Sequence, residues 1–184
     1  MELIDIYDKN GRATGIVRDK KAPLGPEEYR MAVGIWIMNS GGHIFLTKRS
    51  MDKSYAPGKW ENPAGHVQAG EGPEHAVIRE LFEETGLTVH EEQITLLGCS
   101  CRWPYIGRDF GVRMDVDLSN VQFQQGETCD AKWVTFDEFI TMARDGEFAP
   151  SLTDHMRDYW EAFLEFAGRL GSRELDFLTV EEQR

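Results

Sequence analysis

The chain has 184 residues, of which 41% are hydrophobic and 28% are charged, a composition typical of a globular protein with a sizeable core. The formal net charge of −12 argues against a polyanionic partner such as a nucleic acid polymer or an acidic membrane surface. Residues 1–10 lack the basic and apolar regions of a secretory signal, and no apolar run is long enough to span a bilayer. We therefore expect a cytoplasmic protein.

Apolar segments separated by turn residues predict the strands. DKNG at 8–11 and NSGG at 39–42 favour two hairpins, and residues 20–28 and 50–65 are rich enough in Pro and Gly to indicate loops. The predicted strands lie at residues 3–7, 13–17, 32–39, 43–49, 94–103, 110–118 and 130–136.

Three later segments predict helices. Residues 73–85 begin with Pro73, which suits a first helical turn, and Gly86 is well placed as the C-terminal cap. Residues 137–146 and 151–171 predict a short helix and a terminal helix. The pattern favours an α/β fold, in which helices cover a twisted sheet with mostly hairpin connections. No break in composition marks a second domain.

The helix predicted at 73–85 carries an unusual concentration of acidic residues. Glu80, Glu83 and Glu84 share an arc of about 100° on a helical wheel. The opposite side, which we expect to face the core, holds Ile78, Leu81, Phe82 and Thr85. A solvated charged face is one interpretation. The other is a cation site, because Mg²⁺ and Mn²⁺ prefer clustered carboxylates, and Arg79 at the edge of the arc is placed to brace them.

The stretch GHVQAGEGPEHAVIRELFEETGL, residues 65–87, resembles the Nudix box. The fixed positions of that signature are matched by Gly65, Glu71, Arg79, Glu80, Leu81, Glu83, Glu84, Gly86 and Leu87. The resemblance extends over about residues 30–148 and implies an α/β/α sandwich around a mixed sheet, with an N-terminal β-hairpin and a C-terminal helix added here. We expect a single domain at 1–184, composed of a hairpin and linker (1–28), a core (29–148) and a helix and tail (149–184).

The family resemblance implies hydrolysis of the diphosphate bond in a nucleoside diphosphate linked to another group, or in a similar small molecule, with Mg²⁺ or Mn²⁺ as cofactor. By position, Glu80, Glu83 and Glu84 are the expected metal ligands. The Gly65 carbonyl and Glu71 are further candidates for metal binding, and Arg79 would orient the carboxylates.

The general base differs among members of the family. Glu83 is the first candidate here and Glu127, in a predicted loop, is the second. Residues expected to contact the substrate are His66, Trp103, Tyr105 and Arg113, since aromatic rings stack on bases and Arg binds phosphate.

A closer resemblance connects ELIDIYDKNGRATG and the stretch EYRMAVGIWIMN to APGKWENPAGHVQAGE with the branch that contains the type I isopentenyl diphosphate isomerases. Those isomerases carry a proton-transferring Cys immediately before the Gly-His of the loop, where this chain has Ala64. An alkyl side chain cannot transfer a proton. A hydrolase is therefore expected, with an isomerase-like enzyme and a non-catalytic Nudix binding module as the alternatives.

Cysteines and the remaining histidines give weaker indications. Cys99, Cys101 and Cys129 are expected to be small buried residues in a reducing compartment. No partner pattern surrounds the other histidines, which we expect at the surface: His43, His75, His90 and His155. By analogy with the family, the N-terminal hairpin or the helix at 151–171 would form the contact of a homodimer.

Overall fold

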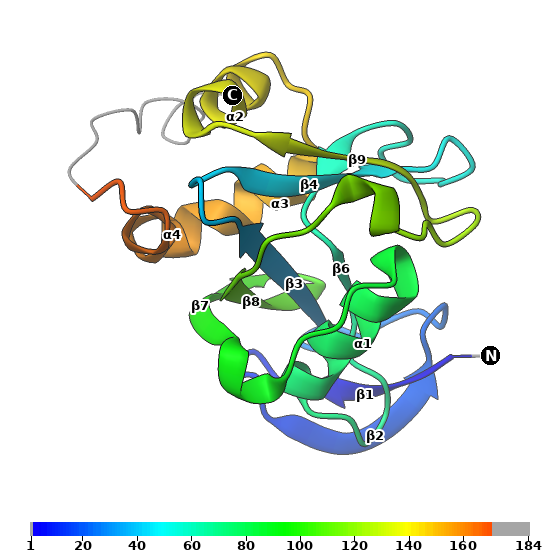
Figure 1. The fold of residues 1–184 in the computed structure, drawn as a ribbon. Coiled ribbons are helices and arrows are strands. Elements are labelled where there is room, and N and C mark those ends of the chain that lie inside the picture. Colours follow the sequence, from blue (N-terminus) through cyan, green and yellow to red (C-terminus); the bar gives the residue numbers. More distant parts are fainter. Residues whose placement is uncertain (1, 171–184) are drawn as a thin grey trace.

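A computed structural model describes residues 2–170, and each predicted strand has its counterpart there (Figure 1). Two further short strands, β5 and β6, lie in the segment predicted as a loop. The strands are β1 (Leu3–Tyr7), β2 (Ala13–Asp19), β3 (Arg30–Met38), β4 (Ile44–Arg49), β5 (Trp60–Glu61), β6 (Ala64–His66), β7 (Thr95–Arg102), β8 (Tyr105–Arg113) and β9 (Thr128–Val134).

Helices follow the predicted positions less uniformly. The helix at 73–85 is confirmed as α1 (Pro73–Thr85), with Gly86 in the left-handed conformation (φ 72°) that ends it. The other helices are α2 (Phe136–Arg144), α3 (Pro150–Met156) and α4 (Trp160–Phe166), with 3₁₀ turns η1 (Glu91–Gln93), η2 (Leu118–Asn120) and η3 (Arg157–Tyr159). No helix within residues 2–170 has the length and apolar character needed to cross a membrane.

The main sheet of the described chain has seven strands and mixed direction. Its order is β5-β4-β3-β8-β7, with β6 also paired to β3 and β9 to β4. Strands β3 and β8 are parallel over their full length, from Arg30↔Tyr105 to Met38↔Arg113, and the other pairs are antiparallel. The sequence predicted mostly hairpin connections. Strands β3 and β8 are an exception, because the chain crosses over through α1 between these two central strands.

Strands β3 and β4 separate soon after their hairpin. They pair at Ile37↔Phe45 and Met38↔Ile44, and beyond that point β6 takes the place of β4 beside β3, at Ala32 to Gly34. Figure 1 shows β4 and β9 turning away from β3 and β8. The sheet thus divides into two arms, and a cavity lies where they diverge.

Each face of the sheet buries its own apolar cluster, because side chains alternate along β3. Ile35 and Ile37 pack with Leu81 of α1 on one face. On the other face Trp36 packs with Phe139 of α2 and Phe163 of α4, with ring centroids 5.7 and 4.8 Å apart. Helices therefore cover both faces, which confirms the predicted α/β/α sandwich with a mixed sheet.

The N-terminal hairpin β1–β2 forms a separate two-stranded sheet against the core. The Ala69 amide donates to the Leu3 carbonyl (2.9 Å), and the Gly70 amide donates to Asp5 Oδ2 (2.8 Å). Tyr7 and Tyr29 exchange backbone hydrogen bonds of 2.9 Å. These bonds connect the hairpin to the loop before α1 and to the residue before β3.

Two predictions of element bounds are wrong. The helix predicted at 151–171 is broken into α3, η3 and α4, and the tail from residue 171 lies outside the described residues. Strand β8 begins at Tyr105, five positions before its predicted start. The prediction began too late because Arg108 and Asp109 interrupt an otherwise apolar pattern, although Asp109 is buried in the structure.

The cysteines also differ from expectation, since Cys99, Cys101 and Cys129 are all exposed. The first two lie on β7 at the edge of the sheet, where the alternation turns Ser100 inward instead (3% exposed).

Candidate active site

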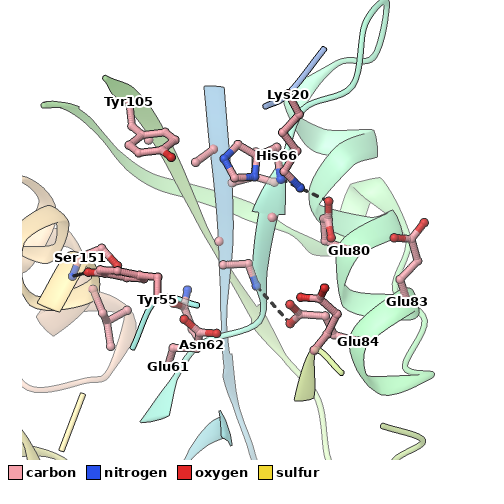
Figure 2. A pocket seen from close by; sticks show the side chains of 18 of the residues that line it. Lys20, Tyr55, Glu61, Asn62, His66, Glu80, Glu83, Glu84, Tyr105 and Ser151 are labelled. Carbon is pink, nitrogen blue, oxygen red and sulfur yellow. Dashed lines mark hydrogen bonds between the residues drawn. The ribbon is translucent and has the colours of Figure 1, made fainter. Parts of the chain in front are cut away.

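A cavity of about 1050 Å³ opens between the diverging arms of the sheet. Helix α1 and strand β6 form one wall, and β8 with α3 and η3 forms the wall opposite (Figure 2). The charged residues that line it are Glu2, Lys20, Arg49, Lys53, Glu61, Arg79, Glu80, Glu83, Glu84, Asp109 and Glu127.

Helix α1 presents a different face to the protein than the wheel predicted. The buried residues of α1 are Ala76, Val77, Leu81, Glu84 and Thr85, whereas Phe82 is 54% exposed. The helix is thus turned about its axis by roughly 100° from the predicted orientation. As a result the acidic arc faces the cavity and the sheet rather than open solvent, and the interpretation as a merely solvated face is wrong.

Backbone amides of β6 hold two of the three carboxylates. The His66 amide donates to Glu80 Oε1 (3.2 Å) and the Ala64 amide donates to Glu84 Oε2 (3.4 Å). The Glu80 carboxyl occupies the space where a Cβ of residue 65 would lie, so Gly65 is required for this approach. The short strand and the helix therefore form one unit.

Burial raises the pKa values of these two carboxyls. The pKa of Glu84 is raised well above its usual value by burial and by the negative charges of Glu61 and Glu80. Burial also raises the pKa of Glu80, and the nearby Arg79 opposes this rise only in part. Glu83 is the more accessible of the three, with 41% of its side chain exposed.

Arg79 connects the acidic residues. Its Nη1 lies 2.9 Å from Glu80 Oε1 and 3.2 Å from Glu83 Oε2, and its Nη2 donates to Glu71 Oε2 and to the His66 carbonyl, both at 2.9 Å. Burial would lower the pKa of the guanidinium, but Glu71 and Glu80 outweigh it and raise that pKa. The same contacts lower the pKa of Glu71 despite its partial burial. Glu71 lies behind Arg79, and it is absent from the cavity lining.

The donor chemistry of this wall fits a divalent cation. Among residues 2–170, no three Asp, Glu, His or Cys side chains converge closely enough to form a ready-made metal site. Four carboxylates nevertheless border the same space, Glu61, Glu80, Glu83 and Glu84, and one of them is buried beside two others. Mg²⁺ and Mn²⁺ prefer such oxygen ligands, and a cation there would relieve the mutual repulsion.

Basic side chains that the sequence analysis did not single out line the rim of the cavity. Arg49 Nη1 lies 2.7 Å from Glu61 Oε1, and Lys20 Nζ lies 2.9 Å from Glu2 Oε2. Lys53 forms an ion pair with Glu127, which places Glu127 in the cavity lining. Arg49 is the last residue of β4 and Lys53 lies in the loop that follows, and a basic residue at a strand end is the signal that would have indicated this position.

Of the residues predicted to contact substrate, the structure brings two together. His66 and Tyr105 both line the cavity, with ring centroids 5.6 Å apart. Burial, with the charges of Lys20, Arg30 and Lys53, lowers the pKa of His66 to about 3, so the ring is neutral at physiological pH.

Trp103 and Arg113 are not brought to the cavity, which corrects the prediction for both. Trp103 is 62% exposed in the β7–β8 turn and is absent from the lining. Arg113 stands at the opposite end of β8 from Tyr105, where its Nη2 donates to the Phe166 carbonyl (2.5 Å). Because β8 crosses the whole sheet, residues at its two ends cannot share one site.

A buried polar cluster forms the wall opposite α1, and the sequence analysis missed it. Asp109 is 7% exposed, and burial raises its pKa to about 7, although the nearby polar groups of Tyr159 and Asn62 oppose the rise. Trp36 Nε1 donates to the Tyr159 hydroxyl (3.1 Å). His155, expected at the surface, is half-buried and lines the same wall. A charged residue in the middle of an apolar strand pattern was the available signal.

Comparison with known proteins agrees with this geometry. The family model described as NUDIX domain matches residues 28–156. The chain is 30% identical over 156 residues to a Nudix hydrolase of Listeria monocytogenes, covering 82% of this chain and 89% of that protein. It is 32% identical over 130 residues to an RNA pyrophosphohydrolase of Vibrio atlanticus, covering 59% and 72%.

Solved structures share the architecture. A protein from Deinococcus radiodurans superposes with a TM-score of 0.68 at 22% identity, covering 80% of this chain and 92% of that one. A MutT protein from Methanosarcina mazei superposes with a TM-score of 0.57 at 25% identity, covering 77% and 91%. The first likeness is one of fold alone.

Proposed function

The chain belongs to the Nudix hydrolase family and is a hydrolase of diphosphate bonds, and from this premise we propose that it cleaves a nucleoside diphosphate linked to another group, with Mg²⁺ or Mn²⁺ as cofactor. One observation carries the proposal. The carboxylates of α1 face a cavity of about 1050 Å³ whose rim also carries Arg49, Lys53 and Lys20. Carboxylates for a metal and cations for phosphates therefore border one space.

Each residue of the acidic wall has a proposed role. Glu80, Glu83 and Glu84 would hold the metal, with the Gly65 carbonyl beside them, because β6 amides and Arg79 already fix two of these carboxylates in position. Arg79 orients the set, and Glu71 acts through Arg79 rather than on the metal. A bound divalent cation would neutralise the diphosphate and lower the pKa of a water molecule.

The same wall supplies the proposed base. Glu83 has the most accessible of the three carboxylates, so it is suited to accept the proton of the attacking water while the new oxygen–phosphorus bond forms and the bridging bond breaks. Glu127 is the weaker candidate, because its carboxylate is already engaged in an ion pair with Lys53. His66 and Tyr105 would contact the substrate.

Hydrolysis is favoured over isomerisation by the residue before Gly65. The Ala64 amide holds Glu84, and the methyl group of Ala64 has no proton to transfer. A non-catalytic binding module is disfavoured because the acidic set is complete and buried against the cavity. Placement within the isomerase-like branch stays a prediction.

The chain as a whole is proposed to act as one domain on a small diphosphate. Backbone bonds from the hairpin to residues 69 and 70 connect the segment 1–28 to the core 29–148, and α3 of the segment 149–184 contributes to the cavity. The net charge of −12 favours a small substrate over an RNA, although some relatives are named RNA pyrophosphohydrolases. The homodimer and the cytoplasmic location stay predictions.

A substrate screen tests the function. Purified protein with Mg²⁺ or Mn²⁺ is incubated with nucleotide sugars, dinucleoside polyphosphates, oxidised nucleotides and isoprenyl diphosphates, and the phosphorylated products of each cleavage are separated and measured by ion-exchange chromatography. We expect hydrolysis of at least one nucleotide class and its loss, by about 10²-fold or more, in Glu83→Gln, with the exposed Glu165→Gln as control. Isomerisation of isopentenyl diphosphate at a comparable rate would overturn the proposal.

A further inference from the structure

The cavity wall opposite α1 has the chemistry of a recognition site rather than of a phosphate site. We propose that Asn62 and Asp109 bind the edge of a nucleobase in the substrate, where a hydrogen-bond donor stands beside an acceptor. This inference rests on the proposed function, because it assigns the nucleoside end of the same substrate to a particular part of the cavity.

Two side chains converge on a glycine at the base of this wall. Strand β3 places Gly34 directly beside Asp109 of β8. A Cβ on residue 34 would lie 2.7 Å from Asn62 Nδ2 and 2.8 Å from Asp109 Oδ1, closer than packing allows. The absent side chain therefore leaves room for Asn62 and Asp109 to meet from opposite sides, and both line the cavity.

Asn62 has an unused donor there. Its side chain is buried, with 3% of the residue exposed, yet Nδ2 has no hydrogen-bond partner of standard geometry among the described residues. It lies near enough to Asp109 to affect that carboxyl without forming such a bond. Figure 2 shows the amide of Asn62 directed into the cavity. A buried donor left unpaired is costly, so a ligand or a water molecule is expected to satisfy it.

A second unsatisfied group lies behind the wall, outside the cavity lining. Ser100 Oγ is buried and has no hydrogen-bond partner in the described chain. Gly107, which faces it across β7 and β8, has no space for a side chain, because a Cβ would meet Ser100 Oγ and lie 3.5 Å from both Asp109 Oδ2 and His155 Nδ1. Asp109 therefore lies between two buried polar groups, Asn62 and Ser100, that lack hydrogen-bond partners of standard geometry in the described chain.

Near neutral pH the wall lacks the positive charge that a phosphate requires. Burial raises the pKa of Asp109 to about 7, so a large fraction of the carboxyl is protonated and presents a donor beside an acceptor. Burial also lowers the pKa of His155 and raises that of Tyr159, and both stay neutral. Lys20, the cation nearest to His66, stands on the opposite wall (Figure 2). An uncharged heterocycle suits this wall, whereas phosphates suit the other.

The size and shape of the cavity agree with this division. A volume of about 1050 Å³ exceeds what a diphosphate alone would fill. Tyr55, whose hydroxyl accepts from the Ser151 amide (3.1 Å), lies over this side of the cavity and supplies an aromatic surface beside Leu152. The Arg49 guanidinium lies over one face of the Tyr55 ring, 5.6 Å from its centroid, so a base would pack against the other face.

Binding of nucleosides without phosphate or metal isolates the recognition step. The full chain is titrated with adenosine, guanosine, cytidine and uridine in the presence of chelator, and the dissociation constants are measured by ligand-observed NMR. We expect at least one nucleoside to bind. Asp109→Leu and Asn62→Ala should weaken this binding about tenfold or more, because each removes a hydrogen bond in a buried site.

Asp109→Asn distinguishes recognition from mere packing. An amide also presents a donor beside an acceptor, so this variant should bind within about threefold of the wild type although Asp109→Leu does not. The exposed Asn120→Ala, in η2, serves as the control and should bind like the wild type. Thermal melts check that each variant is folded, and Asn62→Ala, which only removes atoms, keeps the test valid if Asp109→Leu does not fold.

The outcomes separate this inference from the proposed function. If no nucleoside binds, or if all variants bind equally, the wall holds only water and the inference is overturned, while hydrolysis of a base-free isoprenyl diphosphate would still support the hydrolase. If nucleosides bind through Asn62 and Asp109 but no diphosphate is cleaved, the inference stands and the proposed function fails.

Discussion

At the scale of the single residue, Gly65 determines where the Glu80 carboxyl can lie in the site. Its Cα lies against the Glu80 carboxyl, so any side chain at this position must displace a proposed metal ligand. We expect Gly65→Ala to reduce kcat/KM by about 10²-fold or more, because misplacing one catalytic group by about an ångström has that effect. Steady-state kinetics measure the loss, and Gly72→Ala is the comparison, because Gly72 has an extended backbone (φ −82°) and a Cβ there would meet only Glu74 Oε2, at 3.8 Å. Equal losses in both variants would contradict the role of Glu80.

Asp109 gives the stability of the protein a dependence on pH. Its pKa is about 7 in the folded protein and near 3.8 without the protein environment. Folding therefore favours the protonated form, so the contribution of Asp109 to stability is complete below about pH 4, decreases as the pH rises, and is lost above about pH 7.

Asp109→Asn should remove this dependence, since an amide does not titrate. Relative to wild type, the variant is expected to gain roughly 2–4 kcal/mol in free energy of unfolding between pH 4 and pH 8. Urea denaturation at the two pH values measures the difference. The contributions of the other carboxyls to the free energy of unfolding cancel, because both proteins contain them. A constant difference between variant and wild type would show that Asp109 is ionised throughout.

At the scale of the element, α1 illustrates what a sequence pattern can and cannot predict. Proline and glycine at its ends determine its bounds, so the predicted span of 73–85 is correct. Its orientation was wrong, because apolarity alone placed Phe82 in the core and left Glu84 outside. The pairing of β6 with β3, which buries Glu84, joins residues distant in sequence, and no local pattern contains that information.

We expect Glu84, the buried carboxylate of α1, to support activity while it lowers the stability of the fold. Glu84→Gln keeps the shape of the side chain and removes the charge that burial, Glu61 and Glu80 disfavour. We expect this variant to melt at a higher temperature than the wild type above neutral pH, and to lose about 10²-fold or more in activity. Calorimetry measures the melting temperature, and separation of the phosphorylated products of hydrolysis measures the activity. A lower melting temperature with unchanged activity would contradict the assignment.

Other elements follow the same division between local and distant information. The strands of the sheet were predicted because alternating or continuous apolar residues mark them, whereas β5 and β6 are too short to show a period. Within the site, the resemblance at 65–87 was enough to predict the acidic residues. The polar residues Asn62, Asp109 and His155 could not be predicted in this way, because the pairing of β6 and β8 with β3 and the packing of α3 bring them to one cavity.

At the scale of the whole molecule, the acidic wall predicts that metal binding and folding are coupled. A ligand that binds only the folded state raises the melting temperature, and the rise grows with ligand concentration. Millimolar Mg²⁺ or Mn²⁺ should therefore raise the melting temperature of the wild type, and excess chelator should reverse the effect. The rise should be much smaller in Glu80→Gln, whereas the exposed Glu165→Gln should respond like the wild type. An equal rise in both variants would place the cation elsewhere.

The divergence of β3 and β4 has a consequence for how this molecule changes over generations. The acidic wall is built from β6 and α1, whereas the polar wall is built from β8, α3 and η3, with Asn62 added from the turn before β6. Mutations in β8 or α3 alter the polar wall at positions outside β6 and α1, which hold Glu80 and Glu84 by hydrogen bonds. Selection can thus exchange one preferred substrate for another while the bond-breaking apparatus is inherited unaltered.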